Sequence, residues 1–377
     1  MTQETHAMTP ENDPVRDPPV QSILYPTYAY HHPRRQAWRI QVQGILHRKL
    51  PVSLAKRLML KGLRRALQMP PDTSDGRVFE SRVDGFLATP EKGTKVRIMA
   101  DNFVYRLRQR SKRSGLFQGR IDIPLSMIQL TESIRKDELP KLDSSGLDSS
   151  GLDSYGLDSW VIPSRSSVFE LQTDLEFGAA TGKVYIADRT GLSVITDIDD
   201  TIKITDVTSR SRMLSRTFLE PFEPIEGMAS LYQKLHQQGA MFHYVSSSPW
   251  QIFGPLQEFL DENGFPGGSM HLKWFRLRDE FFKRWSIIRR KSKAGTIVAM
   301  LKRMPQRTFL LIGDSGERDP EIYAKIAKRF PQQVREVWIR DVAGNPMTDP
   351  RRDRLIGWMG AIPLRVFCEP EELLAVL

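Results

Sequence analysis

The sequence predicts an α/β protein in which a doubly wound parallel sheet follows a smaller β-rich, sandwich-like domain. In the second half of the chain strands alternate with helices, as expected when helices pack on both faces of a parallel sheet. Over residues 77–187 apolar and polar residues alternate with period two, which predicts short strands separated by turns. At 377 residues the chain is long enough for two cores. We therefore expect domains over residues 21–190 and 191–377, after a disordered tail in residues 1–20.

Composition describes an ordinary soluble protein, with 40% hydrophobic and 27% charged residues. The 55 Lys and Arg exceed the 45 Asp and Glu by 10, and this surplus favours anionic partners such as nucleic acid, lipid headgroups or phosphorylated substrates. The single cysteine, Cys368, excludes an intrachain disulfide. No secretory signal and no apolar run of the ~20 residues needed for a membrane helix is visible. We expect a cytoplasmic protein whose membrane contact is at most peripheral.

The N-terminal domain begins with a strand, since Trp38, Ile40 and Val42 alternate with polar residues. A basic amphipathic helix follows near residues 53–68, with Leu54 and Leu58 on its apolar stripe and Lys and Arg on the rest. Two interpretations of this helix stay open. It is a domain helix with a solvated face, or it lies on an anionic membrane surface.

Further strands are predicted at residues 95–98, 103–107 and 169–177, the last being the most regular alternation in the chain. The basic residues over 106–113 are either solvated edge charges or an anion-binding surface. Residues 142–159 repeat the unit Leu-Asp-Ser-Ser-Gly with a five-residue period, which cannot form a packed core by itself. We interpret this repeat as an expanded surface loop, and the sequence leaves its role open.

The C-terminal domain is predicted from alternating apolar runs and helical patterns. Strands are expected at 194–195, 241–245, 308–312 and 334–342, with helices at 228–235, 249–262, 293–302 and 321–329.

Carboxylates gather directly after the first of these strands, where Asp197, Asp199 and Asp200 occupy three of four positions. Such a cluster repels itself, so a divalent cation is its natural counter-charge. The further polar residues at strand ends or helix starts are Ser246, Lys293, Asp314 and Asp319. A parallel sheet would bring all of them to one edge, where open α/β sheets bind ligands.

This set of residues suits phosphoryl transfer. One carboxylate attacks phosphorus, a second acts as general acid and then base, Mg2+ offsets charge, and a hydroxyl and a lysine orient the phosphoryl oxygens. Taken singly, each residue also has a plainer interpretation. Ser246 could cap a helix, Lys293 could be one of several solvated cations beside Lys291, and Asp314 could be a turn residue.

At these motifs the sequence resembles the haloacid dehalogenase-like phosphatase superfamily, whose four motifs match Asp197-Ile-Asp199-Asp-Thr201, Ser246, Lys293, and Gly313-Asp314 through Asp319. It is still more similar to one branch, the actin-patch-type phosphatidate phosphatases, which are relatives of the lipins. That likeness rests on longer segments in the same order, namely 193–202, 224–228, 242–251, 264–266, 292–293, 311–323 and 339–342. It covers roughly the second half of the chain.

The resemblance implies a role for each matching residue. Asp197 would be nucleophile and Mg2+ ligand, and Asp199 general acid and base at the same metal site. Thr201 would support the turn, Ser246 would hold a phosphoryl oxygen, and Lys293 would steady the charge. Asp314 and Asp319 would bind the metal. The choice of Lys293 over Lys291 rests on the resemblance and not on spacing.

The resemblance also implies the substrate, phosphatidate, which would be hydrolysed to diacylglycerol and phosphate. The segment 267–291 interleaves cations with aromatic residues, as suits an anionic membrane interface or single-stranded nucleic acid. The resemblance favours the lipid and disfavours nucleic acid. Two alternatives remain: a phosphatase of soluble phosphomonoesters or phosphoproteins, and a non-catalytic module that binds anionic lipid. The oligomeric state is left open by the sequence.

Overall fold

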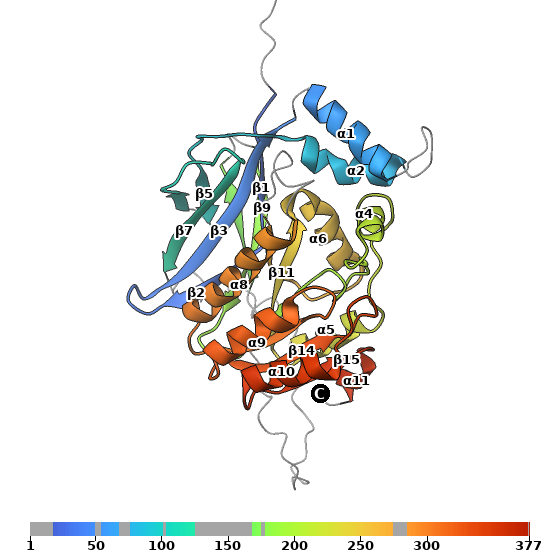
Figure 1. Cartoon of the computed structure of the whole chain (residues 1–377). Helices are drawn as coiled ribbons and strands as arrows, with labels where there is room; N and C mark the ends of the chain where they lie inside the picture. Colours follow the sequence, from blue (N-terminus) through green and yellow to red (C-terminus); the bar gives the residue numbers. More distant parts are fainter. Residues whose placement is uncertain are drawn as a thin grey trace, which may run out of the picture.

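The computed structural model describes residues 18–49, 54–67, 76–100, 103–124, 168–174, 178–273, 285–375 and 377. The repeat at 142–159, most of the N-terminal tail, residues 175–177 and the aromatic part of the basic segment, 274–284, lie outside the described residues. The chain forms a mixed α/β structure with two separate sheets (Figure 1).

The C-terminal sheet has six parallel strands in the order β12-β11-β10-β13-β14-β15. Their bounds are β10 Leu192–Thr196, β11 Met241–Pro249, β12 Gly268–Lys273, β13 Thr308–Asp314, β14 Val334–Arg340 and β15 Leu364–Phe367. After β10 the chain adds β11 and then β12 on one side of it. It then returns, places β13 on the other side of β10, and adds β14 and β15 beyond β13. Ligands of such sheets bind beyond the carboxyl ends of the strands at this reversal.

Helices cover both faces of the six-stranded sheet. Val194 of β10 packs into one core with Leu231 and Leu256, while the next residue, Ile195, packs into another with Ile297 and Tyr323. This is the period of a strand buried on both sides. The helices are α4 Arg210–Phe218, α5 Met228–Gln237, the 3₁₀ turn η2 Trp250–Ile252, α6 Phe253–Glu262, α8 Trp285–Arg303, α9 Asp319–Arg329, α10 Asp349–Met359 and α11 Glu371–Leu374. The alternation of strands and helices predicted for this half is confirmed.

The N-terminal sheet has nine strands, ordered β1-β3-β2-β9-β8-β5-β6, with β4 and β7 also paired to β3. The strands are β1 Gln21–Leu24, β2 Thr27–His32, β3 Ala37–Arg48, β4 Thr89–Pro90, β5 Arg97–Ala100, β6 Phe103–Arg106, β7 Leu116–Pro124, β8 Val168–Thr173 and β9 Thr181–Ala187. Their inward side chains, among them Ile40, Ile98, Ile121 and Val184, form one hydrophobic core. A β-rich half with a sheet of its own is thus present, as the alternating pattern predicted.

Two helices precede most of these strands, α1 Leu54–Ala66 and α2 Gly76–Leu87. The helix near 53–68 was predicted, but the assignment of β structure from residue 77 onward is wrong for α2. Its buried residues Phe79, Val83 and Phe86 recur at the spacing of a helix face and not of a strand.

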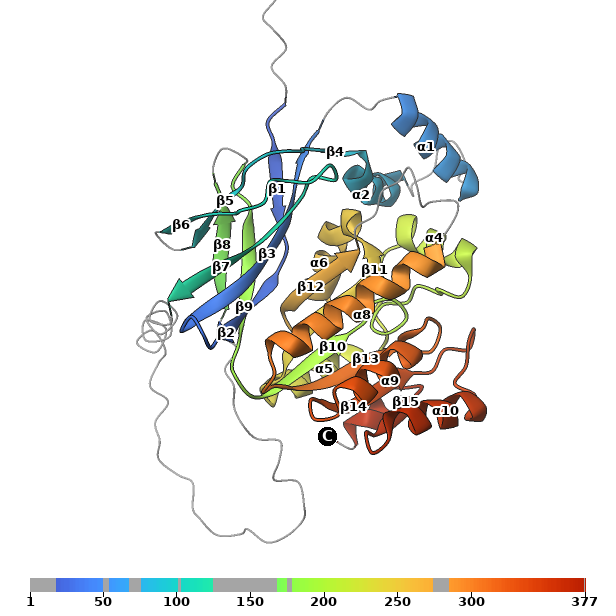
Figure 2. The ribbon, with the colours of Figure 1, turned by 60° about the vertical axis from the view of Figure 1, so that its left-hand side comes forward.

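The α1–α2 pair packs against the C-terminal half of the chain. Leu63 of α1 and Phe79 of α2 belong to the same core as Val194 of β10. Helix α2 lies against η2, which directly follows β11 (Figure 2). A Cβ at Gly85 would come within 2.2 Å of the carbonyl oxygen of Gln251, so only glycine permits this approach. The helix pair therefore supports the end of the sheet at which β11 terminates.

Candidate active site

Asp197 and Asp314 meet because β10 and β13 are neighbours in the parallel sheet. Thr196 pairs with Ile312, and the amide of Asp197 donates a 3.0 Å hydrogen bond to the carbonyl oxygen of Ile312. Asp197 directly follows β10, and Asp314 is the last residue of β13. Both carboxylates are buried at the carboxyl edge of the sheet.

Asp319 and Lys293 complete this group from the helices above. Asp319 is the first residue of α9, where the helix dipole favours a negative charge. The Lys293 ammonium group donates a 2.7 Å hydrogen bond to Oδ2 of Asp319 and lies 3.0 Å from Oδ1 of Asp197. The Tyr323 hydroxyl donates to Oδ2 of Asp319 at 3.2 Å. A Cβ at Gly313 would lie 2.4 Å from the same oxygen, so glycine makes room for the carboxylate.

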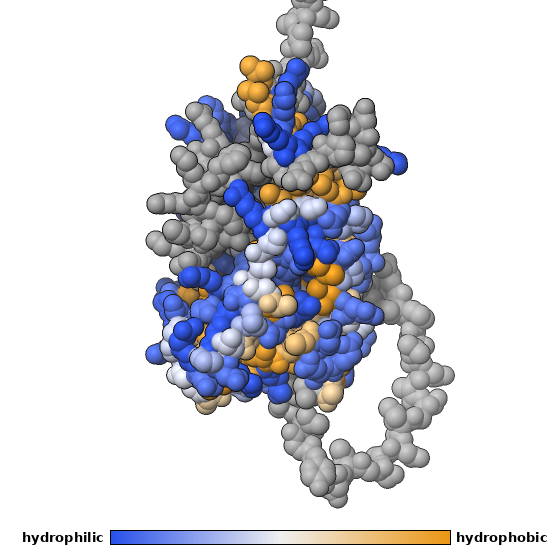
Figure 3. Space-filling view, turned by 45° about the vertical axis from the view of Figure 1, so that its right-hand side comes forward, coloured by the Kyte–Doolittle hydropathy of each residue, from blue (hydrophilic) through white to orange (hydrophobic). Residues whose placement is uncertain are grey.

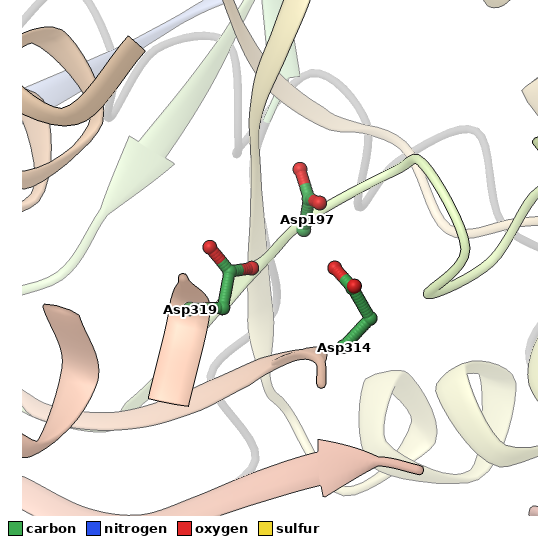
Figure 4. Close-up of side chains that lie close together, drawn as sticks. All are labelled: Asp197, Asp314 and Asp319. Atoms are coloured by element: carbon green, nitrogen blue, oxygen red, sulfur yellow. The ribbon is translucent and has the colours of Figure 1, made fainter. Parts of the chain in front are cut away.

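The side chains of Asp197, Asp314 and Asp319 lie close together (Figure 4). Among the residues that the structure describes, one oxygen from each lies within 4.8 Å of the others. Burial raises the pKa of Asp197 to about 7, against the opposite effect of Lys293. It raises the pKa of Asp319 to about 6. For Asp314, burial and the neighbouring Asp319 and Asp197 raise the pKa well above its usual value.

This acidic cluster fits a divalent cation. One ammonium group faces three buried carboxylates, so negative charge is in excess. Oδ2 of Asp314 is buried and accepts no hydrogen bond from the described residues, whereas Oδ1 accepts one of 2.9 Å from the amide of Glu317. Carboxylate oxygens are the ligands that hard cations such as Mg2+ prefer.

Asp199 lies in a different environment from the acidic cluster and is not among its three members. Ser248 and Ser246 donate hydrogen bonds of 2.6 Å and 3.1 Å to Oδ2 of Asp199. On the other oxygen, Thr205 donates at 2.9 Å and the ammonium group of Lys203 lies at 3.0 Å. Burial raises the pKa of Asp199, but Lys203 and these hydrogen bonds outweigh it and hold the pKa below its usual range. Asp199 is therefore a carboxylate, and each of its two oxygens has two hydrogen-bond or ion-pair partners.

A tight turn at Asp200 brings Lys203 and Thr205 back to Asp199. Asp200 has a φ of 53°, in the left-handed region that Asp tolerates better than most residues. Its carboxylate accepts hydrogen bonds of 2.6–2.8 Å from three successive backbone amides, residues 205–207. The amide of Thr201 donates to the carbonyl oxygen of Ile198 at 3.3 Å inside this buried turn.

The structure thus gathers the predicted residues into two adjoining groups, with Asp197, Lys293, Asp314 and Asp319 in one and Asp199 and Ser246 in the other. Sequence analysis missed Lys203, Thr205 and Ser248, which all contact Asp199. Lys203 gave a weak signal, since it stands between Ile202 and Ile204 close after the carboxylates. Ser248 was indistinguishable from its neighbours Ser246 and Ser247. The side chain of Lys291 lies outside what the structure describes.

The fold and these residues define an α/β protein. Its parallel sheet carries a buried cluster of carboxylates, two of which form ion pairs with the side chain of Lys293. Residues 192–341 match the family model described as the catalytic domain of phosphatidate phosphatase APP1. The matched segment contains every residue of this cluster.

Two curated proteins each match less than half of the chain. An uncharacterized protein of Schizosaccharomyces pombe is 33% identical over 168 residues, which is 44% of this chain and 27% of that protein. Phosphatidate phosphatase APP1 of Saccharomyces cerevisiae is 37% identical over 163 residues, 42% of this chain and 27% of its own. The match thus spans about a quarter of the length of either relative.

A solved carbohydrate esterase structure aligns over 91% of this chain and 97% of its own, at a TM-score of 0.22 and 8% identity. A likeness this low carries no argument about fold or function. Within the described ranges, no helix combines the length and the apolar character that crossing a membrane requires.

Proposed function

We propose that this protein is a Mg2+-dependent phosphatidate phosphatase, which hydrolyses phosphatidate to diacylglycerol and phosphate through an aspartyl-phosphate on Asp197. The observation that carries the proposal is the placement of Lys293 between Asp197 and Asp319, beside Asp314 and 3.0 Å or less from two carboxylates. The match of residues 192–341 to the family model of the phosphatidate phosphatase APP1 catalytic domain supports the choice of reaction. In this proposal residues 191–377 form a haloacid dehalogenase-like, doubly wound catalytic domain, and residues 21–190 a β-rich N-terminal domain.

In the first step a carboxylate oxygen of Asp197 attacks phosphorus, and the bond from phosphorus to the glycerol oxygen breaks. Asp199 gives its proton to that oxygen, so diacylglycerol leaves as an alcohol. Without substrate Asp199 is a carboxylate, but the negative charge of an arriving phosphate raises the pKa of a neighbouring carboxyl. Substrate binding therefore favours the protonated form that a general acid needs.

In the second step Asp199, now a carboxylate, takes a proton from water as the water oxygen attacks phosphorus. The bond from phosphorus to Asp197 breaks, which releases inorganic phosphate and regenerates the Asp197 carboxylate. Ser246 and Ser248 fix the position of Asp199 through their hydrogen bonds of 3.1 Å and 2.6 Å. In this proposal Ser246 also donates to a phosphoryl oxygen once substrate is bound, and Thr201 supports the turn that carries the two aspartates.

Asp197, Asp314 and Asp319 would hold the Mg2+ ion. When bound, the ion neutralises charge on the phosphoryl oxygens and on the three carboxylates. Lys293 stays between Asp197 and Asp319, favours the ionised form of the Asp197 carboxylate and orients it for attack. These residues exclude water from the cluster, since each is at most 4% exposed.

Helix α1 supports peripheral contact with an anionic lipid surface. Leu54 and Leu58 are 74% and 61% exposed, and the exposed basic residues of the same helix are Arg57, Lys61, Arg64 and Arg65. On this face apolar and strongly hydrophilic side chains lie side by side (Figure 3). Leucines enter the acyl boundary while cations pair with headgroups. Because α2 packs next to η2, the α1–α2 pair lies at the end of the sheet that carries the site.

The test is phosphate release from phosphatidate in mixed detergent micelles, compared with release from soluble phosphomonoesters and a phosphoprotein, each with Mg2+ and with chelator. We expect strong preference for phosphatidate and no activity in chelator. A preference for the soluble esters would show that the substrate is a soluble phosphomonoester and not phosphatidate. Binding of anionic vesicles without any phosphate release would show the non-catalytic lipid-binding alternative.

A further inference from the structure

A polar cavity lies outside the carboxylate site, between the N-terminal sheet and helix α8. Its volume is about 860 Å3, within the range of small-molecule sites. One wall is formed by β3 and β7, and the opposite wall by the C-terminal half of α8, from Gly295 through Ala299 to Arg303. Figures 1 and 2 both place this part of α8 beside β2 and β3.

The strand wall is polar because β3 and β7 bury only one of their faces. Ile40 and Val42 of β3 point into the core of the N-terminal sheet, so the alternate residues Arg39, Gln41 and Gln43 point away from it. The antiparallel register pairs these three with Asp122, Arg120 and Gln118 of β7. A ladder of arginine and glutamine therefore faces α8 across the cavity.

The cavity carries a strong positive charge. Five arginines line it against a single carboxylate, Asp122. Asp122 is already occupied by Arg39, through hydrogen bonds of 2.6 Å and 2.8 Å, and by Arg35 at 3.0 Å. Arg303 donates to the neutral hydroxyl of Tyr28 at 2.9 Å. Within the described part of the chain neither Arg108 nor Arg120 pairs with a carboxylate, so both are available to an anion.

A buried hydrogen-bond donor on the cavity wall, the side-chain amide of Gln41, lacks in the described part of the chain an acceptor that a ligand would supply. The side-chain nitrogen of Gln41 is buried, and the described residues offer it no hydrogen-bond acceptor. A buried donor without an acceptor destabilises the folded protein, because it has lost its hydrogen bond to water. Gln43, Gln109 and Gln118 also line the cavity, and each amide can both donate to and accept from hydroxyl groups.

From this cavity we infer a binding site for a multiply phosphorylated, hydroxyl-rich group such as an inositol phosphate, free or as the headgroup of a lipid. Arginine forks match phosphate oxygens bidentately, and the glutamines match the ring hydroxyls. A nucleobase is a poorer fit. Of the two aromatic rings among the lining residues, Tyr28 is fully buried, and His271 packs against the Tyr28 ring at 5.9 Å between centroids. The site shares α8 with Lys293, so its occupant touches the helix that supplies the lysine of the acidic cluster.

The experiment measures binding of inositol trisphosphate to the full chain by calorimetry, in chelator, where the acidic cluster repels phosphate. The wild-type protein should bind saturably at one site. Arg108→Glu together with Arg120→Glu should weaken the Kd at least tenfold, and Ala299→Glu on the opposite wall should do the same. Arg113→Glu is the matched control, because Arg113 is exposed near β7 and does not line the cavity; its Kd should equal that of the wild type.

Gln41→Leu tests the site independently of charge. Removing a buried donor that lacks an acceptor should raise the thermal stability of the free protein, while binding weakens. A purely structural role of Gln41 would move stability and leave the Kd unchanged, which would count against the site.

A second arm separates the two sources of the ligand. Cosedimentation uses phosphatidylcholine vesicles with and without phosphatidylinositol bisphosphate. If the free inositol phosphate binds saturably and the cavity variants lose this binding, the site is supported and its ligand is soluble. If only the vesicles with phosphatidylinositol bisphosphate bind, and the cavity variants lose that binding, the site is supported and its ligand is a lipid. No saturable binding to either probe, or binding that the cavity variants leave intact, would overturn it. Equally tight binding of adenosine triphosphate with the same losses would overturn the hydroxyl-rich class.

Discussion

The ammonium group of Lys293 lies 3.0 Å from Oδ1 of Asp197, although the two residues belong to elements almost 100 positions apart in the sequence. Lys293 is 4% exposed and Asp197 1%, so neither charge is compensated by water. Burial lowers the pKa of Lys293, but Asp197 and Asp319 outweigh this effect and raise it above the usual value. The lysine therefore remains a cation inside the protein and favours the ionised form of Asp197, the nucleophile of the proposed reaction, against the effect of burial.

Replacing Lys293 with Met should abolish most of the proposed phosphatase activity. The variant keeps the length of the side chain but leaves three buried carboxylates without their ammonium partner. We expect kcat to fall by about 10²–10³, as when an oriented electrostatic group is removed. Loss of one partner of a buried pair should also lower the free energy of unfolding by about 3–5 kcal/mol.

Steady-state kinetics and chemical denaturation of the same preparation check both effects. Lys302→Met is the matched control, since Lys302 lies on the same helix but is exposed. Full activity of the Lys293 variant would remove the lysine from the mechanism.

Asp199 and Ser248 should differ in the size of their effects. Asp199→Asn keeps the shape of the side chain but removes the proton that the reaction needs, so kcat should fall by about 10²–10⁴. Ser248→Ala removes only the 2.6 Å hydrogen bond that positions Asp199. We expect about a tenfold loss in kcat with little change in KM, and partial recovery in Ser248→Thr, which restores a hydroxyl. A tenfold rise in KM would instead show that Ser248 contributes to substrate binding.

The sequence predicted where the site lies better than how its groups are held. Asp197, Asp199 and Asp314 follow apolar strands, and parallel strands bring their carboxyl ends to one edge whatever the loops do. The contacts of Lys203 and Thr205 with Asp199 depend on the left-handed turn at Asp200. No period or spacing in the sequence predicts this left-handed turn, because Asp is also common in turns of other types.

Helix α2 shows the same limit in the fold. Phe79, Val83 and Phe86 recur at helical spacing, yet the surrounding period-two segments dominated the interpretation of residues 77–187. Helix α2 packs against η2 and α4, and the rings of Phe86 and Phe218, more than 100 residues apart in the sequence, lie 5.6 Å apart. Long-range partners of this kind decide secondary structure where local patterns compete.

Metal binding should show as a stability change as well as an activity change. Mg2+ that binds the acidic cluster stabilises the folded state by about 2.7 kcal/mol when its concentration is 100 times the Kd. Asp314→Asn should abolish this increment. In chelator, however, the same variant should unfold at a higher temperature than the wild type. The pKa of Asp314 is raised by burial and by its acidic neighbours, so ionisation of this carboxyl destabilises the fold above its ordinary pKa.

Thermal unfolding with and without Mg2+ measures both signs. An Asn variant that is less stable than the wild type in chelator would show that Asp314 has a structural role, and a Mg2+ increment that survives the substitution would place the ion elsewhere.

Exposed leucines of α1 should govern association with membranes. Each of Leu54 and Leu58 contributes roughly 1.5–3 kcal/mol if buried in lipid. Leu54→Glu with Leu58→Glu should therefore reduce binding to phosphatidate-containing vesicles at least tenfold, and lower the rate of phosphatidate hydrolysis in them. Vesicle cosedimentation provides the measurement. Ile356→Glu is the control, because Ile356 is 40% exposed but lies on α10; equal losses in both variants would contradict a specific role for α1.

His243 should make the protein less stable in mild acid. It lies fully buried in β11, with Nδ1 2.7 Å from the hydroxyl of Ser269 and the edge of Tyr28 packed on its ring. Burial, followed by the charges of His271 and Arg307, lowers its pKa well below the usual 6.5. The folded protein thus keeps His243 neutral, whereas the unfolded chain takes up a proton below pH 6.5. As the pH falls through that value, the free energy of unfolding should drop by up to about 1.4 kcal/mol per pH unit.

Urea denaturation at several pH values between about 5 and 7.5 measures this slope. His243→Gln removes the titrating group, so its stability should decline less steeply with acid than that of the wild type. Ser269→Ala is the matched control. It removes the hydrogen-bond partner and keeps the histidine, so stability should fall at every pH while the slope remains. Parallel slopes in the wild type and in His243→Gln would mean that the buried imidazole is not the group whose protonation unfolds the protein.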